Sequence, residues 1–454
     1  MDGARPACKR LCRAVVCVCA TLLAVLLGVP GSANAQTPRT VVTFTLDDGS
    51  VSQISGARIL SKYGMRGTFY VVSGSIGARS YLSLDDLRAL AAAGHEIGGH
   101  TVNHPDIIAV SPDEARREIC QDRANLVHWG FRPTSFAYPF GSFNREAEQA
   151  AQDCGYNSSR VTGSIRTGHG CSNCAPAESV PPLNPQMVRG TGMIDPEWTL
   201  EDLQQVVLRA EASGGGWVPL VLHQTCDFCG PLSISPVVLD QFASWLAQRQ
   251  ANGTVVRTVD QVIGGGFRAL VSPPAPAPRD GLVNASLEEP GPRGWVQSSW
   301  GQNNPQWTMV GDAHSGRWAQ RLDITEYTSG DAKLMQQLDM GEAAPAAHAN
   351  NTYDLSAWYK STAPTQLAVY RRDETGVWRY WITSPWFGAS ADWASAKWTT
   401  PSAPEGTTGL SFGLTLAGRG SLTTDDYGLH EHVIPKGEAF CARLPWISLL
   451  RWLC

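Results

Sequence analysis

Short apolar runs alternate with stretches of helical periodicity between residues 41 and 268. Residues 41–46 (Val-Val-Thr-Phe-Thr-Leu) and 217–222 (Trp-Val-Pro-Leu-Val-Leu) have the continuous apolar character of buried strands. Strand–helix units of about 30 residues predict a parallel sheet, curled into a barrel, from residue 41 to about residue 268. Chemistry in such folds gathers at the carboxyl ends of the strands. Helices are predicted to begin where a hydroxyl can cap the first turn, after Ser83, Ser111 and Thr199.

A different pattern follows this region. The proline-rich run at residues 272–278 predicts a stiff spacer over residues 269–280. Residues 281–435 then hold ten of the 16 tryptophans, in short runs separated by Gly, Asn and Ser turns. Because helical periodicity is weak there, we expect an all-β sandwich. The apolar tail over residues 436–454 has no assignment.

The first 35 residues are typical of a secretory signal peptide. A basic start precedes an apolar stretch over residues 14–29, and Ala33-Asn34-Ala35 forms a small-residue cleavage site. No stop-transfer charge follows, so we expect removal rather than anchoring, and a secreted or cell-wall-associated chain. The net charge of −5 over 454 residues argues against a nucleic-acid binder.

Eight of the 12 cysteines lie after the predicted signal peptide. An even number in an exported chain favours disulfides. The C-x-x-C motifs at residues 171–174 and 226–229 could instead form one four-thiolate zinc site. We favour disulfides because the expected compartment is oxidising, and Cys120 and Cys154 are candidates for another bridge.

Three short motifs each follow a predicted strand. Residues 45–49 (Thr-Leu-Asp-Asp-Gly) present two adjacent carboxylates, residues 100–104 (His-Thr-Val-Asn-His) present two histidines, and His223 ends an apolar run. On one helical turn the H-x-x-x-H spacing would put both imidazoles on one side. Two imidazoles and one carboxylate leave positions open, as a catalytic metal requires. Each motif alone is commonly structural, so their joint occurrence carries the prediction; His95 is interpreted as structural.

These motifs resemble those of the polysaccharide deacetylases of carbohydrate esterase family 4, the NodB-type domain. Residues 45–49 are similar to the family's T-F-D-D-G, residues 100–104 match its H-[ST]-x-x-H, and residues 220–223 resemble its late leucine–histidine motif. The resemblance covers about residues 38–268 and implies that they form a distorted (β/α) barrel. It also implies that Asp48, His100 and His104 are metal ligands. Asp47 is then the general base, and His223 is the general acid.

The implied cofactor is a divalent metal, zinc first, with cobalt or nickel suited to the same ligands. The implied reaction is hydrolysis of an acetamide by water, with Asp47 taking a proton and His223 giving one to the leaving amine. A backbone N–H near Phe140 is expected to help hold the oxyanion.

The sequence departs from the family pattern in two motifs. In the third motif, over residues 130–141, Ala137 stands where the family has the arginine that orients the base. We name Arg160 and Arg189 as candidates to replace that arginine.

The fourth motif, over residues 195–198, has Glu197 where an aspartate commonly precedes the tryptophan. Glu197 is expected to hold the general acid, with Asp195 in reserve. The residues expected to contact substrate are Tyr138, Pro139, Phe140, Trp198, Leu222 and Arg189.

The second region resembles jelly-roll carbohydrate-binding modules at residues 284–288, 353–359 and 424–427. Aromatic faces pack well on the CH groups of sugar rings. We expect a glycan platform formed by Trp378, Tyr380, Trp381 and Trp386. A structural calcium held by Glu288 and Asp426 is a further possibility that the oxygen ligands suggest.

The sequence therefore predicts a secreted, metal-dependent hydrolase that removes N-acetyl groups from GlcNAc-containing glycans such as chitin oligomers, peptidoglycan or poly-GlcNAc. Its expected partner is the N-acetylated polysaccharide, with no nucleic acid and, after signal removal, no membrane. Three alternatives stay open: an O-acetyl (xylan) esterase of the same family, a non-catalytic glycan binder with a degenerate barrel, and an amidohydrolase acting on small amides.

Overall fold

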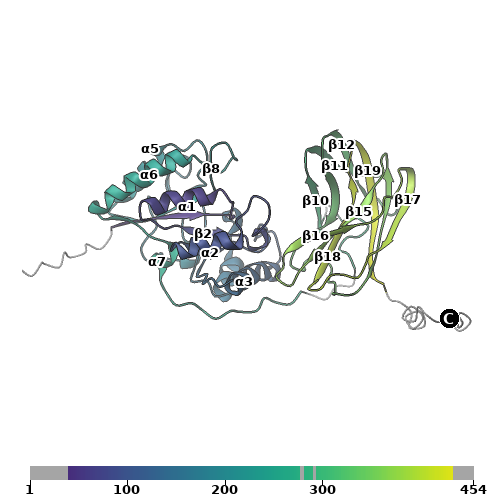
Figure 1. Ribbon diagram of the computed structural model, residues 1–454, viewed down its shortest axis with the longest axis horizontal. Coiled ribbons are helices and arrows are strands. Elements are labelled where there is room, and N and C mark those ends of the chain that lie inside the picture. The colour runs from purple at the N-terminus through teal and green to yellow at the C-terminus, as the bar shows by residue number, and fades with distance from the viewer. Residues whose placement is uncertain (1–38, 277–280, 290–292, 433–454) are drawn as a thin grey trace, which may run out of the picture. The chain divides into compact units, whose positions relative to one another are not determined.

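The computed structural model describes residues 39–276, 281–289 and 293–432, and Figure 1 traces them by colour along the chain. The predicted signal peptide and the predicted C-terminal tail lie outside the described residues, as do Cys441 and Cys454. In the part of the chain that is described, no helix is both long enough and apolar enough to cross a membrane.

The first region is built on one parallel sheet. Its strands run in the order β5-β4-β3-β2-β1-β6, and β9 also pairs with β1. Strand β1 pairs with β6 over its whole length, while its other side meets β9 at Thr40–Val42 and β2 at Thr45 and Leu46. Since one edge of β1 has two partners, the sheet opens there and curls into a half-barrel. The bounds are β1 Thr40–Leu46, β2 Thr68–Val71, β3 Glu96–Gly99, β4 Ser135–Ala137, β5 Ser158–Arg160, β6 Gly216–Leu222 and β9 Thr254–Val256.

Helices cover the outside of this sheet (Figure 1). They are α1 Gln53–Lys62, α2 Leu84–Ala92, α3 Pro112–His128, α4 Arg145–Asp153, α5 Leu200–Ala212, α6 Pro236–Arg249 and α7 Val259–Ile263. Shorter elements are the 3₁₀ turns η1 Ser73–Ser75, η2 Pro139–Gly141, η3 Pro185–Met187 and η4 Gln250–Asn252, and the strands β7 Gln224–Thr225 and β8 Ser233–Ile234.

Side-chain caps start the helices where the sequence predicts them. The Ser83 hydroxyl accepts the Asp86 N–H at 3.1 Å, and the Asp86 carboxylate accepts the Ser83 N–H at 2.8 Å. Thr199 forms the same reciprocal box at the start of α5. Ser111 caps α3, with proline at the first helical position, where its missing N–H costs nothing.

Strand β1 is buried on both faces, as its continuous apolar run predicts. Phe44 faces the helices, and its ring lies 5.9 Å from that of Phe242 on α6. Thr43 and Thr45 face the other way and are satisfied within the sheet: Thr43 accepts the Trp217 indole N–H at 2.8 Å, and Thr45 donates to the Leu220 carbonyl at 2.7 Å.

The second region is a sandwich of two five-stranded antiparallel sheets, β10-β13-β18-β15-β16 and β11-β12-β19-β14-β17. Strand β14 alternates buried and half-buried residues along its length, the pattern expected of a strand with one core face. The predicted order, a curled α/β sheet followed by a β-sandwich, is confirmed. The bounds are β10 Trp295–Trp300, β11 Asn303–Val310, β12 Ala319–Tyr327, β13 Asp331–Gln336, β14 Tyr353–Ser361, β15 Gln366–Arg372, β16 Trp378–Thr383, β17 Ser390–Thr399, β18 Gly409–Leu416 and β19 Gly420–Glu431.

Disulfides join the cysteines of the first region. Cys120 on α3 is bonded to Cys154 at the end of α4, which confirms the predicted bridge. Each C-x-x-C motif closes on itself, at residues 171–174 and 226–229. The four-thiolate zinc alternative is therefore wrong, because no free thiolate is left in either motif.

His95 is buried behind β3 and makes structural contacts only. Its Nδ1 accepts the Gly67 N–H at 3.1 Å, so the ring proton sits on Nε2, 3.3 Å from the Ser61 hydroxyl. Burial, followed by the nearby positive charge of Arg66, lowers the pKa of His95 to about 4. Protonation would also place a second proton against the Gly67 N–H.

His95 should make stability depend on pH. Its pKa is about 4 when folded and about 6.5 when unfolded, so the unfolded chain binds more protons between these values. The contribution of His95 to the free energy of unfolding is complete above pH 6.5, and it is lost progressively as the pH falls from 6.5 to about 4. The free energy of unfolding should decrease between pH 7 and pH 5, and we expect this decrease to be about 1–2 kcal/mol smaller in the His95→Asn variant. Urea unfolding at both pH values measures it; an unchanged loss contradicts the assignment.

Candidate functional site

The three predicted motifs meet at one edge of the parallel sheet. Asp47 and Asp48 follow the last residue of β1, His100 follows β3, and His223 follows β6. Because parallel strands end on the same side of a sheet, these residues come together although they lie far apart in the sequence. The prediction that chemistry collects at strand ends is thus met by the geometry.

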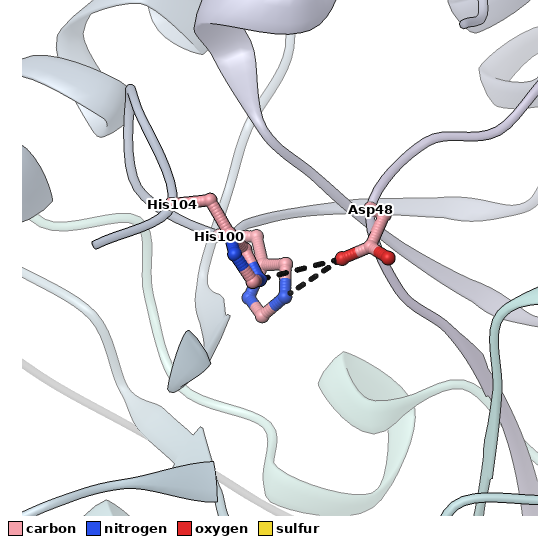
Figure 2. Close-up of side chains that lie close together, drawn as sticks. All are labelled: Asp48, His100 and His104. Carbon is pink, nitrogen blue, oxygen red and sulfur yellow. Dashed lines mark ion pairs between the residues drawn. The ribbon is translucent and has the colours of Figure 1, made fainter. Parts of the chain in front are cut away.

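Asp48 lies against both histidines of the second motif. Figure 2 shows its carboxylate facing the two imidazoles, and Oδ1 is 3.4 Å from Nε2 of His100 and 3.4 Å from Nε2 of His104. The three candidate ligand atoms lie within 4.8 Å of one another. Among the residues that the structure describes, this is the one group of three such side chains this close together. Oδ1 is buried and has no hydrogen-bond donor, so it is free to bind a cation.

The protonation of this group suits a cation. His100 Nδ1 lies 2.7 Å from the Ala137 carbonyl, which can only accept, so the Nε2 lone pair faces Asp48. Burial lowers the pKa of His104 to about 4, which keeps its imidazole neutral. Burial raises the pKa of Asp48, but the three nearby imidazoles, of which His100 has the largest effect, outweigh burial and hold this pKa well below its usual range. An ionised carboxylate and a neutral imidazole are the forms that bind metal.

The two histidines do not lie on a helical turn, so that part of the prediction is wrong. Residues 100–104 form a loop in which Thr101 and His104 adopt positive φ angles of 68° and 56°. Left-handed backbone costs a side-chain-bearing residue about 1–2 kcal/mol. The Thr101 hydroxyl accepts the His104 N–H at 3.0 Å, but this single bond does not account for the loop's shape.

Asp47 and His223 lie beside this group. Asp47 is buried, and its Oδ2 accepts a hydrogen bond from Nη2 of the buried Arg160. Its other oxygen, Oδ1, is buried and has no partner, which leaves it free to take a proton. Gln53, which the sequence analysis missed, donates from Nε2 to the backbone carbonyls of Asp47 and of His223, the latter at 2.9 Å. The signal for Gln53 was weak: one polar residue at the start of a predicted helix.

Comparison with known proteins agrees with this geometry. Residues 34–159, which contain Asp47, Asp48, His100 and His104, match the family model of the polysaccharide deacetylases. This match places polysaccharide deacetylase homology over residues 34–159.

Several curated deacetylases are similar to the same region. YxkH of Bacillus subtilis, a polysaccharide deacetylase, is 30% identical over 119 residues, which are 25% of this chain and 42% of that protein. The peptidoglycan-N-acetylglucosamine deacetylase PgdA of Listeria monocytogenes is 27% identical over 124 residues, or 27% of this chain and 26% of that protein. The chain thus spans less than half the length of these relatives. The solved family 4 carbohydrate esterase from Streptomyces lividans is 18% identical, with TM-score 0.34, covering 52% of this chain and all of that one.

An arginine lies one strand away from Ala137, the position at which the resemblance implies one. Ala137 is the last residue of β4 and pairs in register with Arg160, the last residue of β5. The guanidinium on the neighbouring strand therefore reaches Asp47 from the adjacent position. Arg189, the other candidate, instead binds Glu178, with Nη2 2.7 Å from Oε1 and Nε 2.8 Å from Oε2.

The predicted partner of His223 is not in place. Glu197 is exposed, and the Asp195 carboxylate accepts the Glu197 backbone N–H at 2.9 Å. Nδ1 of His223 is buried without a hydrogen-bond partner. Burial lowers the pKa of His223, although the charges of Asp47 and Asp48 oppose the effect. The expectation that a neighbouring carboxylate keeps this imidazole protonated is therefore wrong for the structure described.

Most of the predicted substrate contacts are buried. Tyr138 packs in the core and donates its hydroxyl proton to the Gln186 carbonyl at 3.1 Å. Trp198 is buried under a stacked His169, with ring centroids 4.9 Å apart. Leu222 and Pro139 are buried as well. Phe140 is 62% exposed, and its ring lies 4.7 Å from that of His104. Arg189 is half-buried.

In the sandwich, the predicted platform divides between two faces. Tyr380 and Trp386 are exposed at 56% and 55%. Trp381 packs against the sandwich core, and the Trp378 indole N–H donates to the Asp339 carbonyl at 3.0 Å, so neither belongs to a flat exposed surface with Tyr380. Trp300, 62% exposed, was missed.

The carboxylates predicted to hold calcium already have protein donors. Glu288 accepts the backbone N–H groups of Arg317 and Trp318, at 2.8–2.9 Å. Asp426 contacts the His314 ring and accepts the Ser315 hydroxyl at 2.7 Å. The calcium site stays a prediction.

Removal of either histidine of the group should abolish tight cation binding. Loss of an outer-shell partner alone typically weakens a metal site 10–100-fold, so we expect His100→Ala and His104→Ala each to weaken cobalt binding by more than about 100-fold. Isothermal titration of the metal-free protein measures this. His128→Ala, an exposed histidine at the end of α3, is the control. Equal affinity in all three variants would exclude this ligand set.

Proposed function

We propose that this chain is an exported, metal-dependent deacetylase that hydrolyses N-acetyl groups of GlcNAc-containing glycans. The observation that carries the proposal is the grouping of Asp48, His100 and His104 beside the Asp47–Arg160 pair and His223. A group of ligands and an ion-paired carboxylate with one free oxygen is what acetyl hydrolysis needs. The relatives named for peptidoglycan and chitooligosaccharide support N-acetylated glycans as the substrate class.

In this proposal Asp48, His100 and His104 hold a divalent cation, zinc or a similar ion. When bound, the cation lowers the pKa of a coordinated water toward neutrality and polarises the acetyl carbonyl. Asp47 takes the water proton on Oδ1, the oxygen that Arg160 leaves free. The imidazolium form of His223 gives its Nε2 proton to the leaving amine, because Nδ1 is enclosed, and the lowered pKa of His223 makes this form a stronger acid. Phe140 bounds the site at the rim beside His104.

The Asp47–Arg160 pair favours a catalytic barrel over a non-catalytic glycan binder. A buried carboxylate without a partner is costly, and Arg160 supplies that partner while it leaves Oδ1 of Asp47 free. The proposed base therefore has an oriented oxygen although residue 137 is alanine.

The sandwich is proposed to hold glycan near the catalytic domain by exposed aromatic rings. Tyr380 and Trp386 are the candidates from the predicted platform, with Trp300 added by its exposure. Binding of insoluble chitin or peptidoglycan by the sandwich, reduced in Tyr380→Ala and Trp386→Ala, supports this assignment.

Acetate release from a panel of glycans tests the activity. We expect release from chitin oligomers, peptidoglycan or poly-GlcNAc, lost on chelation and restored by zinc or cobalt. Asp47→Asn should reduce the rate by about 10²–10⁴-fold, since a positioned base contributes that factor. Release only from acetylated xylan would instead make the chain an esterase, and glycan binding without any release would make it a binder.

An arginine at residue 137 should restore activity that is lost when Arg160 is removed. Arg160→Ala should lower kcat for acetate release by about 100-fold, because Asp47 loses the partner that orients it. Ala137→Arg in the same variant should restore at least about tenfold of that loss, because residue 137 lies beside residue 160 across the strand pair.

The control for this exchange is Arg132→Ala, which removes an exposed arginine of the same motif. A double variant as slow as Arg160→Ala alone would show that the guanidinium must come from β5. An Arg160→Ala variant with full turnover would remove its proposed role.

A further inference from the structure

Two carboxylates of helix α3 lie under the loop that carries the histidine pair. Glu118 and Asp122 are one helical turn apart, so they face the same way, and both are buried, at 1% and 0% exposed. Buried carboxylates need donors. Most of the donors here are N–H groups of residues 100–104 rather than arginine or lysine side chains.

Glu118 holds the middle of the loop. Its Oε2 accepts the backbone N–H groups of Val102 and Asn103, each at 2.9 Å, and its Oε1 accepts the Asn103 side-chain amide at 2.8 Å. These bonds fix the peptide units between the two histidines. They require no contact with either imidazole.

Asp122 holds the start of the loop. Its Oδ2 accepts the His100 backbone N–H at 3.1 Å and the Tyr156 hydroxyl at 3.2 Å, and its Oδ1 accepts the Ser73 N–H at 3.3 Å. Gly99 allows this approach, because a Cβ there would overlap Asp122 and Tyr156. The last residue of β3 is thus small where the carboxylate passes.

The loop's carbonyl groups are held from the other side by η1. Thr101 O accepts the Ser73 N–H at 3.1 Å, and Val102 O accepts the Gly74 N–H at 2.9 Å. Carboxylates on α3 and amides on η1 therefore bracket the five residues. This bracket accounts for a conformation with two left-handed residues, Thr101 and His104, that a free loop would avoid.

We propose that Glu118 and Asp122 are positioning residues that hold residues 100–104 so that both imidazoles face Asp48, and that they thereby set the affinity for the cation. The inference rests on the metal site proposed above. The carboxylates act through the backbone: Asp122 touches His100 only at its main-chain N–H, and Glu118 binds the residues between the histidines.

Isosteric variants separate this role from simple packing. Glu118→Gln and Asp122→Asn keep the volume but replace an acceptor oxygen with an amide donor that faces other donors. We expect each to weaken cobalt binding 10–100-fold, the range for outer-shell partners, and to change the visible absorption of the bound cobalt because the imidazoles are reoriented. Asp113→Asn, an exposed acid on the same helix, should leave both unchanged. Melting of the metal-free proteins shows whether each variant is folded.

Folded variants with the parent's cobalt affinity, within about threefold, and the parent's spectrum would overturn the proposal. If a carboxylate variant does not fold, Asn103→Ala removes one contact of Glu118 and keeps both acids; it should weaken cobalt binding about 3–10-fold, and unchanged affinity again overturns the proposal. A parent protein that binds cobalt but releases no acetate would refute the proposed function without touching this inference.

Discussion

The register between β1 and β6 is the constraint on which the site depends. Their pairing runs the full length of β1 and sets Leu46 opposite Leu222, so the next residues of both strands, Asp47 and His223, emerge side by side. Gln53 then ties the two carbonyls together across the gap. A slip of one residue would turn every side chain of β1 to its other face, which would bury the base among the helices. The positions of Asp47 and His223 therefore depend on the backbone hydrogen bonds between β1 and β6.

The ion pair with Asp47 requires a guanidinium at one place in the site, and either of two neighbouring strands could supply it. Ala137 and Arg160 occupy neighbouring positions at the same level of the sheet, so a long side chain from either can reach Asp47. The backbone carbonyl of Ala137 also fixes the tautomer of His100. Asp47 and His100 are thus oriented from adjacent points of one strand pair, Asp47 through a side chain and His100 through the main chain.

The sequence predicted what strand ends determine and missed what only tertiary register determines. Asp48 and the two histidines were found because each follows a recognisable strand. The choice between Arg160 and Arg189 stayed open because the lateral pairing of short strands leaves no local pattern. The helical reading of residues 100–104 was wrong, since spacing alone does not reveal left-handed backbone. The packing of Trp381 on the core was not predictable, because a β-bulge at Trp381 interrupts the alternation of faces along β16.

The bridge from Cys120 to Cys154 starts between the two acids of α3 and spans 34 residues of sequence. Closing so long a segment lowers the entropy of the unfolded chain and stabilises the folded state by about 4 kcal/mol. A three-residue span contributes about 2 kcal/mol. The disulfide that closes the longest segment therefore begins on α3, the helix that supports residues 100–104. In a reducing compartment these two cysteines would be thiols, and α3, which supports residues 100–104 through Glu118 and Asp122, would lose its covalent link to the end of α4.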